Sequence, residues 1–295
     1  MTIAVESETR RLVKKYGFRF KKSLGQNFLV DEQVLQAIVN AAQLTPGDVV
    51  VEIGPGLGTL TRRLAQQAGR VIAVEVDRNL EPVLRETLAG LDNVEVHWGD
   101  VLKTDLDALV SDKTEQEFGR GGKSYKVVAN LPYYITTPIV MRLLEEGYNL
   151  ESLVIMVQQE VAARLVAAPG TRDCGAISVA VHYHTIPELV TRVSRKAFVP
   201  PPEVESGVVR LTRRTEPPVL VGSEHLFFRV VKAAFAQRRK TLLNALANSG
   251  FSLDKSGWAE LLESLGIDQN RRGETLAIEE FALLSSKLWE RGLGR

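Results

Sequence analysis

The sequence predicts an α/β fold, in which a mostly parallel sheet with an antiparallel finish is followed by a small C-terminal all-α domain. In the first half of the chain, short apolar runs alternate with segments of helical spacing, which is typical of βαβ units. Runs rich in β-formers come next, and only helical patterns follow them. A chain of 295 residues, 44% of them apolar, can bury a large core without disulfides.

Each expected strand of the parallel part is a short apolar run, and most are followed by helical spacing. The strands are expected at residues 48–53, 71–74, 94–96, 125–129 and 153–157. The helices are expected at residues 31–42, 59–68, 79–88, 138–145 and 159–166. Asp31 is a suitable N-cap for the first of these helices, because its carboxylate can accept hydrogen bonds from the free backbone N–H groups at the start of the helix. Continuous apolar strands of this kind indicate a sheet covered by helices on both faces.

The antiparallel finish is expected where runs rich in β-formers follow one another closely. These runs span residues 176–183, 188–193 and 207–211. Pro217 and Pro218 then mark a boundary, because consecutive prolines continue neither a strand nor a helix. The helices of the last part are expected at residues 224–236, 240–248, 255–265 and 278–291.

We therefore expect three parts: a basic N-terminal arm over 1–30, a sheet-containing domain over 31–214 and a helical domain over 215–295. The polar, glycine-rich segment 111–124 is expected to be a surface insertion. The N-terminus has no apolar core of a signal peptide, and no stretch is long and apolar enough to span a membrane. With its single cysteine, Cys174, the chain fits a reducing compartment, so a cytoplasmic location is expected.

The charge is nearly balanced, with 37 basic and 36 acidic residues, but its distribution is uneven. Residues 10–22 hold seven basic side chains and no acid, interleaved with Tyr16, Phe18 and Phe20. Residues 229–240 hold five basic side chains and no acid. Local positive charge of this kind attracts a polyanion such as RNA, although an ordinary solvated surface is the alternative for either run.

A glycine loop, Glu52-Ile53-Gly54-Pro55-Gly56-Leu57-Gly58, follows the first expected strand. The carboxyl edge of an α/β sheet at this point is where nucleotide-like ligands bind. A dinucleotide fingerprint requires G-x-G-x-x-G/A, which this loop lacks, so a dehydrogenase is disfavoured. Glu75 ends the next strand and can accept both ribose hydroxyls, and Asp100 after the third strand can accept an exocyclic amine. The set describes an adenosine lying across the strand ends.

The segment Asn130-Leu131-Pro132-Tyr133-Tyr134 ends the fourth expected strand, beside that ligand. The Asn130 side-chain oxygen and the Leu131 carbonyl can hold the hydrogens of a planar amine and favour a pyramidal nitrogen that attacks an electrophilic methyl group. Pro132 stiffens the turn, and Tyr133 can stack on an extracted base. Tyrosines packed in a core are the alternative for this cluster. The four histidines are dispersed, so no metal site is expected.

Together these motifs resemble the rRNA adenine N6,N6-dimethyltransferase family, which has a Rossmann-like class I methyltransferase sheet. The resemblance spans most of the chain. Besides the glycine loop and Asn130–Tyr134, it rests on Gln26–Leu29, Phe198–Ser206 and Gln237–Leu242. It implies that S-adenosylmethionine is the cofactor and that two adjacent adenines in the 3′-terminal hairpin of small-subunit rRNA are dimethylated. The expected partner is an assembling small ribosomal subunit, and a monomer without metal or membrane attachment is expected.

The resemblance also implies residue roles. The cofactor is expected to contact Asn27, Leu29, Gly54, Gly56, Glu75, Asp100 and Asn130. Asn130, Leu131 and Tyr133 would hold the target base, with Pro132 beside them and Phe198 as a second aromatic wall. The helical domain and both basic windows would contact the RNA backbone, with Lys21, Lys22, Arg238, Arg239 and Lys240 as the named candidates.

Two alternatives remain beside this interpretation. A large-subunit rRNA adenine N6-methyltransferase of the antibiotic-resistance type shares the catalytic logic, but the segment Gln237–Leu242 favours the first family. A non-catalytic ribosome-assembly factor would need no catalytic residues, whereas Gly54, Glu75, Asp100 and Asn130 are all present.

Overall fold

The computed structural model of the chain describes residues 2–18, 20–21, 25–114 and 123–293. These residues form two compact units. The first comprises Met1–Ala162 and Pro187–Arg213, and the second comprises Ala163–Ile186 and Arg214–Arg295. One change between the units falls between Arg213 and Arg214, and the segment 163–186, which was expected to belong to the sheet-containing domain, is grouped with the helical residues.

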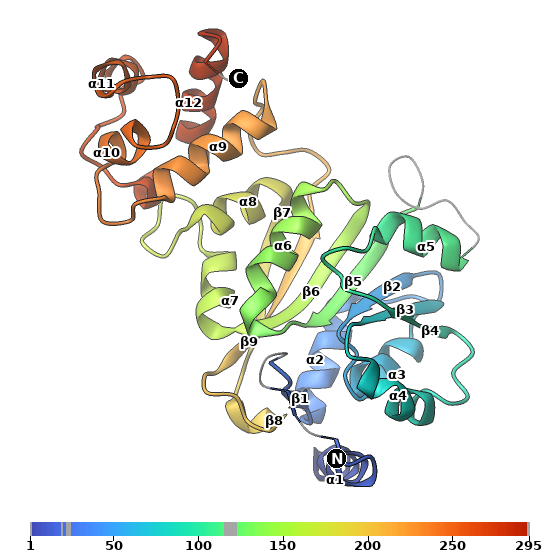
Figure 1. The fold of residues 1–295 in the computed structure, drawn as a ribbon. Coiled ribbons are helices and arrows are strands. Elements are labelled where there is room, and N and C mark those ends of the chain that lie inside the picture. Colours follow the sequence, from blue (N-terminus) through green and yellow to red (C-terminus); the bar gives the residue numbers. More distant parts are fainter. Residues whose placement is uncertain (1, 19, 22–24, 115–122, 294–295) are drawn as a thin grey trace. The chain divides into compact units, whose positions relative to one another are not determined.

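A seven-stranded sheet organises the first unit, and its order is β4-β3-β2-β5-β6-β9-β7 (Figure 1). Neighbouring strands from β4 to β6 run parallel, and β9 runs antiparallel to β6. The predicted mostly parallel sheet with an antiparallel finish is therefore confirmed. The strands are β2 (Val49–Ile53), β3 (Arg70–Glu75), β4 (Val94–Trp98), β5 (Tyr125–Asn130), β6 (Leu150–Gln158), β7 (Thr185–Val193) and β9 (Ser206–Arg213).

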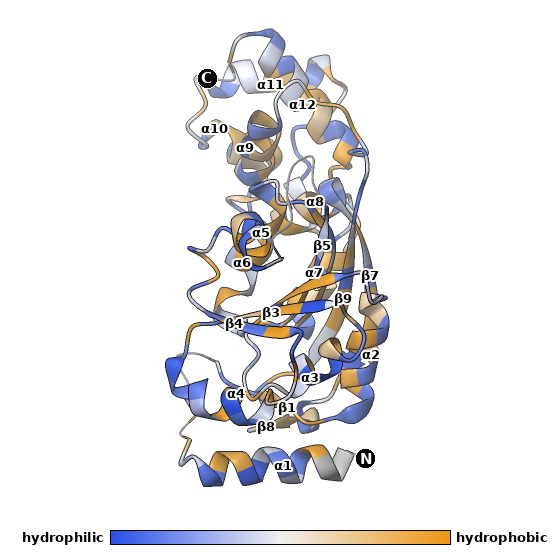
Figure 2. Cartoon of the chain, turned by 90° about the vertical axis from the view of Figure 1, so that its right-hand side faces the viewer, coloured by the Kyte–Doolittle hydropathy of each residue, from blue (hydrophilic) through white to orange (hydrophobic). Residues whose placement is uncertain are grey.

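Helices cover the sheet on both faces, as Figure 1 shows. The face under α2 and α3 forms one core cluster, in which Leu35 and Ile38 of α2 and Leu64 of α3 pack with strand valines. Figure 2 shows the hydrophobic residues gathered along the strands of the sheet. The α-helices of this unit are α1 (Thr2–Lys15), α2 (Glu32–Ala42), α3 (Thr59–Ala65), α4 (Glu81–Thr87), α5 (Leu106–Thr114) and α6 (Thr136–Glu145), and α7 (Gln159–Val166) runs across the unit boundary.

Two very short strands form a separate ribbon beside the carboxyl edge of the sheet. β1 (Phe28–Leu29) pairs antiparallel with β8 (Phe198–Val199), so Leu29 lies opposite Phe198. This pairing joins the segment just before α2 to the segment just before β9. It brings together two of the motifs on which the family resemblance rests.

Residues 2–15 of the N-terminal arm form a helix, α1, which the basic composition did not predict. Leu12 of α1 is buried in a second core cluster with Phe28, and Tyr16, Phe18 and Phe20 pack against this cluster. The aromatic residues of the basic window therefore pack against the protein in this structure. Several of its cations are paired as well, since Arg11 and Lys15 both contact Glu86 of α4.

The second unit is helical among its described residues, apart from the first residues of β7 (Thr185–Val193). Its helices are α8 (Ala176–His184), α9 (Glu224–Phe235), α10 (Leu242–Ala247), α11 (Lys255–Ser264) and α12 (Ile278–Glu290). The strand predicted at 176–183 is wrong, because this run is α8. Most of its residues are buried, so α8 has no polar stripe, and without one a short apolar run gives the same pattern as a strand.

The expected surface insertion at 111–124 is in part helical, since residues 111–114 complete α5. Residues 115–122 lie outside the described residues. Within the described part of the chain, no helix has both the length and the apolar character needed to cross a membrane.

Candidate functional site

A cavity lies at the carboxyl edge of the parallel strands in the first unit. Its walls come from the ends of β2, β3, β4 and β5 and from the segment before β1. Nearly all of the residues singled out by the sequence motifs meet there. The lining includes Gln26, Asn27, Phe28, Gly54, Gly56, Glu75, Asp100, Asn130, Leu131, Pro132, Tyr133 and Tyr134.

The glycine loop between β2 and α3 requires glycine for its conformation. Gly54, Gly56 and Gly58 all have positive φ angles, which are strained for other residues. A Cβ atom at Gly56 would also lie 3.0 Å from the ring of Phe28. The loop therefore places backbone, rather than side chains, against the cavity.

Glu75 ends β3 with its side chain almost fully buried, at 6% exposure of the residue. Its Oε1 accepts a hydrogen bond of 2.7 Å from the Asp77 backbone N–H. Burial raises the pKa of the carboxyl, and backbone N–H groups that include that of Gly56 oppose the rise. A carboxylate held in this way can accept hydrogen bonds from vicinal hydroxyls.

Glu52 is a second buried carboxyl at this edge, and the sequence interpretation gave it no role. The residue is 1% exposed, and its Oε2 has no hydrogen-bond partner among the described residues. Burial raises the pKa of Glu52 to about 8. Glu52 lines a smaller cavity that shares Gly54, Gly56 and Asn130 with the main one. An unpaired buried acid here can receive a positively charged or hydrogen-bonding group of a ligand.

Asp100 follows β4 in a tight turn over residues 100–104. Its Oδ1 accepts from the Leu102 N–H at 2.9 Å, and its backbone carbonyl accepts from the Thr104 hydroxyl at 2.9 Å. Asp100 lines the cavity together with Gly99 and Val101. The turn thus presents a half-buried carboxylate to the cavity that the glycine loop also lines.

The segment after β5 brings an amide, carbonyl oxygens and an aromatic ring into the same cavity. The Asn130 Nδ2 donates to the Asn27 carbonyl at 3.2 Å, which commits the amide nitrogen and leaves the side-chain oxygen as the acceptor. The Leu131 N–H donates to Met156 of β6 and fixes the backbone at that point. Tyr133 is partly buried, and its hydroxyl lies 2.6 Å from the Ser206 hydroxyl.

The remaining predicted site residues lie elsewhere. Leu29 is buried and lines the smaller cavity. Phe198 is 3% exposed, belongs to the core cluster under α2 and α3, and does not line the main cavity. Lys21 donates to Asp77 at 2.8 Å, and Lys22 lies outside the described residues. Arg238, Arg239 and Lys240 are exposed in the turn between α9 and α10 of the second unit.

Three residues of the site environment belong to the motifs of the family resemblance but received no role from the sequence. The Gln26 side-chain amide donates a hydrogen bond to the Asp77 carboxylate at 2.9 Å, and Phe28 lines both cavities. Ser206, the partner of Tyr133, was visible only as the last residue of a motif. No local pattern signals such partners, because they come from segments far apart in the sequence.

A parallel sheet with a glycine loop after its first strand and carboxylates after the next two defines a class I methyltransferase. The model of the ribosomal RNA adenine dimethylase family matches residues 17–288 of this chain. The chain therefore belongs to that family, whose members transfer methyl groups from S-adenosylmethionine. The carboxylates of Glu75 and Asp100, the open glycine backbone and the unpaired oxygen of Glu52 fit this cofactor.

Full-length relatives carry a more specific name. The proteins called ribosomal RNA small subunit methyltransferase A of Pelotomaculum thermopropionicum and Moorella thermoacetica are 53% and 54% identical to this chain. The first alignment covers 99% of both chains, and the second covers 97% of this chain and 99% of its relative.

Solved structures resemble the chain at lower identity. A dimethyladenosine transferase from Plasmodium falciparum has a TM-score of 0.73 at 24% identity, covering 90% of this chain and 98% of that one, which shows the shared fold. The 23S rRNA methyltransferase ErmE has a TM-score of 0.66 at 27% identity, covering 89% of this chain and 99% of that one.

Proposed function

We propose that this chain dimethylates N6 of two adjacent adenines in the 3′-terminal hairpin of small-subunit rRNA, within an assembling small ribosomal subunit. One observation carries the proposal: the amine-holding segment Asn130–Tyr133 shares a single cavity with the carboxylates Glu75 and Asp100. The names of full-length relatives at more than 50% identity support the small subunit as the source of the RNA.

In this proposal, the side chains at the strand ends bind and orient the cofactor. Glu75 accepts the ribose hydroxyls, Asp100 accepts the amine of the cofactor's adenine, and the backbone at Gly54 and Gly56 lies against it. When bound, S-adenosylmethionine supplies an electrophilic methyl group. Asn27 fixes the amide of Asn130 through its carbonyl, so the cofactor pocket and the base pocket share one hydrogen bond.

The chemistry then depends on how the target amine is held. The lone pair of an adenine amine is delocalised into the ring, so the amine is a poor nucleophile. The Asn130 side-chain oxygen and the Leu131 carbonyl accept its two hydrogens and favour a pyramidal nitrogen with a directed lone pair. Tyr133 stacks on the flipped base. The amine needs no strong base, because the nitrogen becomes acidic only after it has accepted the methyl group.

RNA contact is assigned to the exposed cations of the second unit. Arg238, Arg239 and Lys240 are adjacent and exposed, with no acidic residue between positions 229 and 240. We assign the N-terminal window a smaller share, because Lys21, Arg11 and Lys15 are paired with acidic side chains. We further propose that the enzyme acts as a monomer without a metal ion.

The large-subunit alternative is kept because ErmE has a similar structure at 27% identity. The test is transfer of labelled methyl groups from S-adenosylmethionine to undermethylated small subunits and to naked large-subunit rRNA. We expect dimethyladenosine only in the small-subunit RNA. Label only in the large-subunit RNA would favour the alternative, and tight subunit binding without transfer would favour a non-catalytic assembly factor.

The catalytic assignment is tested separately with Asn130→Ala. This variant should retain most of its affinity for S-adenosylhomocysteine and lose methyl transfer, because the amine loses an acceptor. Full transfer by Asn130→Ala would refute the role of this side chain. Asn79→Ala is the matched control, since the Asn79 amide serves the turn at Asp77 rather than the end of β5.

A further inference from the structure

The turn that carries Asp100 is closed by hydrogen bonds onto Asp100 itself. Residues 100–104 form no regular helix or strand, and the bonds within the turn converge on the Asp100 carboxylate and the Asp100 carbonyl. The chain must nevertheless hold the carboxylate in one position if it is to distinguish adenine from other bases. These bonds join the residues of the turn to one another, so a contact from outside the turn adds to the hold on the carboxylate.

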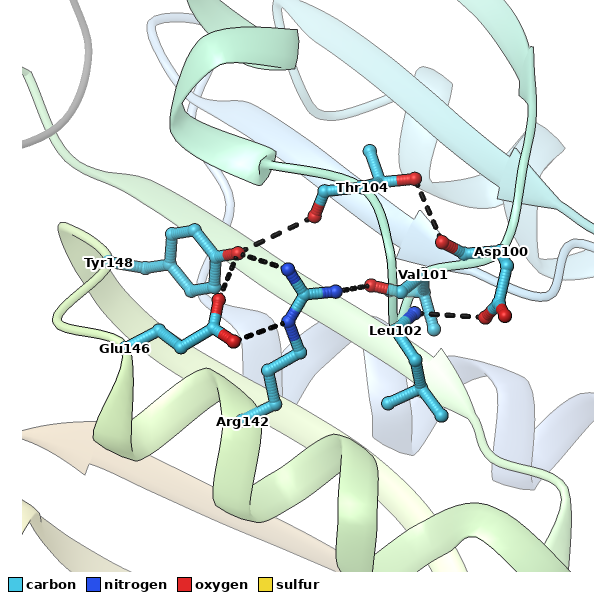
Figure 3. Close-up of polar contacts among 7 residues, drawn as sticks. All are labelled: Asp100, Val101, Leu102, Thr104, Arg142, Glu146 and Tyr148. Atoms are coloured by element: carbon cyan, nitrogen blue, oxygen red, sulfur yellow. Dashed lines mark hydrogen bonds and ion pairs between the residues drawn. The ribbon is translucent and has the colours of Figure 1, made fainter.

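Arg142 of α6 supplies such an anchor, as Figure 3 shows. Its Nη1 donates to the Val101 carbonyl at 2.5 Å, one residue from Asp100. The Tyr148 hydroxyl lies 3.4 Å from the Thr104 carbonyl, at the other end of the turn. Both ends of the turn thus lie against side chains from the end of α6 and the segment that follows it (Figure 3).

The guanidinium is itself held in place by two further groups. Its Nε donates to Glu146 at 2.9 Å and its Nη2 donates to the Tyr148 hydroxyl at 3.0 Å, and this hydroxyl donates to the other Glu146 oxygen at 2.7 Å. The Arg142 side chain is 17% exposed, so water competes little for its donors. The hydrogen bond from Arg142 lowers the pKa of Glu146, so the Arg142 guanidinium favours the charged form of this carboxylate.

The arrangement exceeds what helix stability requires. An exposed ion pair between residues i and i+4 of a helix contributes little. Arg85 and Glu81 of α4 form such a pair, at 3.0 Å. Arg142 and Glu146 have the same spacing, but this arginine also binds a main-chain carbonyl in the wall of the cavity. The fixed fork of a guanidinium suits this, because it can bond three partners at once.

We propose that Arg142 is a positioning residue, which sets specificity for the adenine of the cofactor by holding the turn 100–104. It acts through Asp100 and touches neither cofactor nor RNA. The proposal rests on the proposed role of Asp100 as acceptor of the adenine amine. Without Arg142 the Val101 carbonyl loses its donor, and the turn can move the carboxylate away from the amine.

The test measures, by calorimetry, the affinity of the full chain for two ligands: S-adenosylhomocysteine and its analogue with unsubstituted purine in place of adenine. The parent should prefer the adenine ligand by about tenfold or more, as a lost hydrogen bond to a charged group implies. Arg142→Met should lose most of this preference, with the purine ligand bound nearly as before. Arg85→Met is the matched control and should keep the full preference.

A double variant separates positioning from general damage. In an Asp100→Ala background, which should already lack the preference, Arg142→Met should change neither affinity further. Arg142→Lys keeps a single donor group and should therefore retain part of the preference for the adenine ligand. If Arg142→Met does not fold, Arg142→Lys replaces it in the same comparison and should show a partial loss of that preference.

Equal weakening of both ligands by Arg142→Met, or an unchanged preference, would overturn the proposal while leaving the assignment of Asp100 intact. If Asp100→Ala itself kept the full preference, the assignment of Asp100 would fail first and this proposal with it. The two failures are therefore distinguishable in one set of measurements.

Discussion

At the scale of single residues, the two buried carboxyls of the cavity differ in what surrounds them. Glu75 accepts a backbone hydrogen bond from Asp77, whereas Glu52 keeps one oxygen without a partner among the described residues. Burial raises the pKa of both, and that of Glu52 reaches about 8. In the protein without a ligand, Glu52 therefore holds a proton at neutral pH.

This proton makes stability depend on pH. An ordinary glutamate ionises near pH 4.5, so the unfolded chain releases the Glu52 proton long before the folded chain does. The folded state therefore loses stability relative to the unfolded state as pH rises from 4.5 to about 8. The loss by pH 7 is at most about 3.5 kcal/mol, at 1.4 kcal/mol for each pH unit above 4.5. Glu52→Gln should remove this part of the pH dependence.

The measurement is urea unfolding of parent and Glu52→Gln at pH 5 and pH 8, without cofactor. The variant should gain stability relative to the parent as pH rises. If the free energy of unfolding changed with pH in the same way in both proteins, a raised pKa of Glu52 would be contradicted. Glu81→Gln on α4 serves as the control, because Glu81 forms an exposed ion pair with Arg85 on the surface of that helix.

Glu75 gives a second prediction at this scale. Glu75→Ala should weaken binding of S-adenosylhomocysteine by about 1–3 kcal/mol, because bonds to a charged acceptor are lost and the Asp77 N–H loses its partner. Titration calorimetry measures the change, with Glu81→Ala as the surface control. An unchanged affinity would show that Glu75 does not contact the ribose.

How far the sequence predicts the site depends on the kind of residue. Glu75, Asp100 and Asn130 were predictable, since each ends a recognisable strand and parallel strands end at one edge. Arg142 and Ser206 were not, because their roles depend on contacts between segments far apart in the sequence. The role of Phe198 as a wall of the base pocket, which the family resemblance implies, stays a prediction; in this structure Phe198 belongs to a core cluster.

At the scale of elements, α1 and α8 show what sequence patterns miss. The five parallel strands were predictable because each is an apolar run in an alternating series. α8 escaped because a helix buried on most sides lacks a polar stripe. α1 was not predicted, because basic residues dominate the window 10–22, whereas its docking depends on a few apolar residues such as Leu12. Figure 2 shows both hydrophilic and hydrophobic residues along α1.

Glu86 of α4 connects this helix to α1 and to the residue that follows it. The Glu86 carboxylate forms ion pairs with Lys15 at 2.6 Å and Arg11 at 3.3 Å, and it accepts a hydrogen bond from the hydroxyl of Tyr16. The hydrogen bond from Lys15, followed by that from Tyr16, lowers the pKa of Glu86 to about 2. This stabilisation is therefore fully present above the ordinary pKa of 4.5 and is lost as pH falls toward 2.

Glu86→Gln should loosen α1 without unfolding the sheet, because Leu12 still packs in its cluster. Hydrogen exchange of residues 5–15 should be faster in the variant at pH 7, and the difference from the parent should shrink below pH 4.5. Glu81→Gln changes the same helix without touching α1 and should leave the exchange unchanged. Equal exchange in all three proteins would show that apolar contacts alone hold α1.

At the scale of the whole molecule, the balanced charge gives no sign of an RNA-binding protein. A net charge of +1 results from 37 basic and 36 acidic residues, so any attraction for RNA must come from local groups. In the N-terminal window, Arg10, Arg11, Lys15 and Lys21 all contact acidic side chains. The turn between α9 and α10 differs, because its three adjacent cations are exposed.

Replacement of Arg238, Arg239 and Lys240 by glutamine should therefore weaken binding to small-subunit rRNA and reduce its salt dependence. Each cation that neutralises a phosphate releases counterions, so three lost contacts should lower the slope of log affinity against log salt by about 2 to 3. Binding measured over a range of salt concentrations gives this slope. Glutamine at Arg172, Lys255 and Arg291, three exposed cations of the same unit, removes equal charge and should change the slope less. If both triple variants changed it equally, overall charge rather than this turn would govern RNA binding.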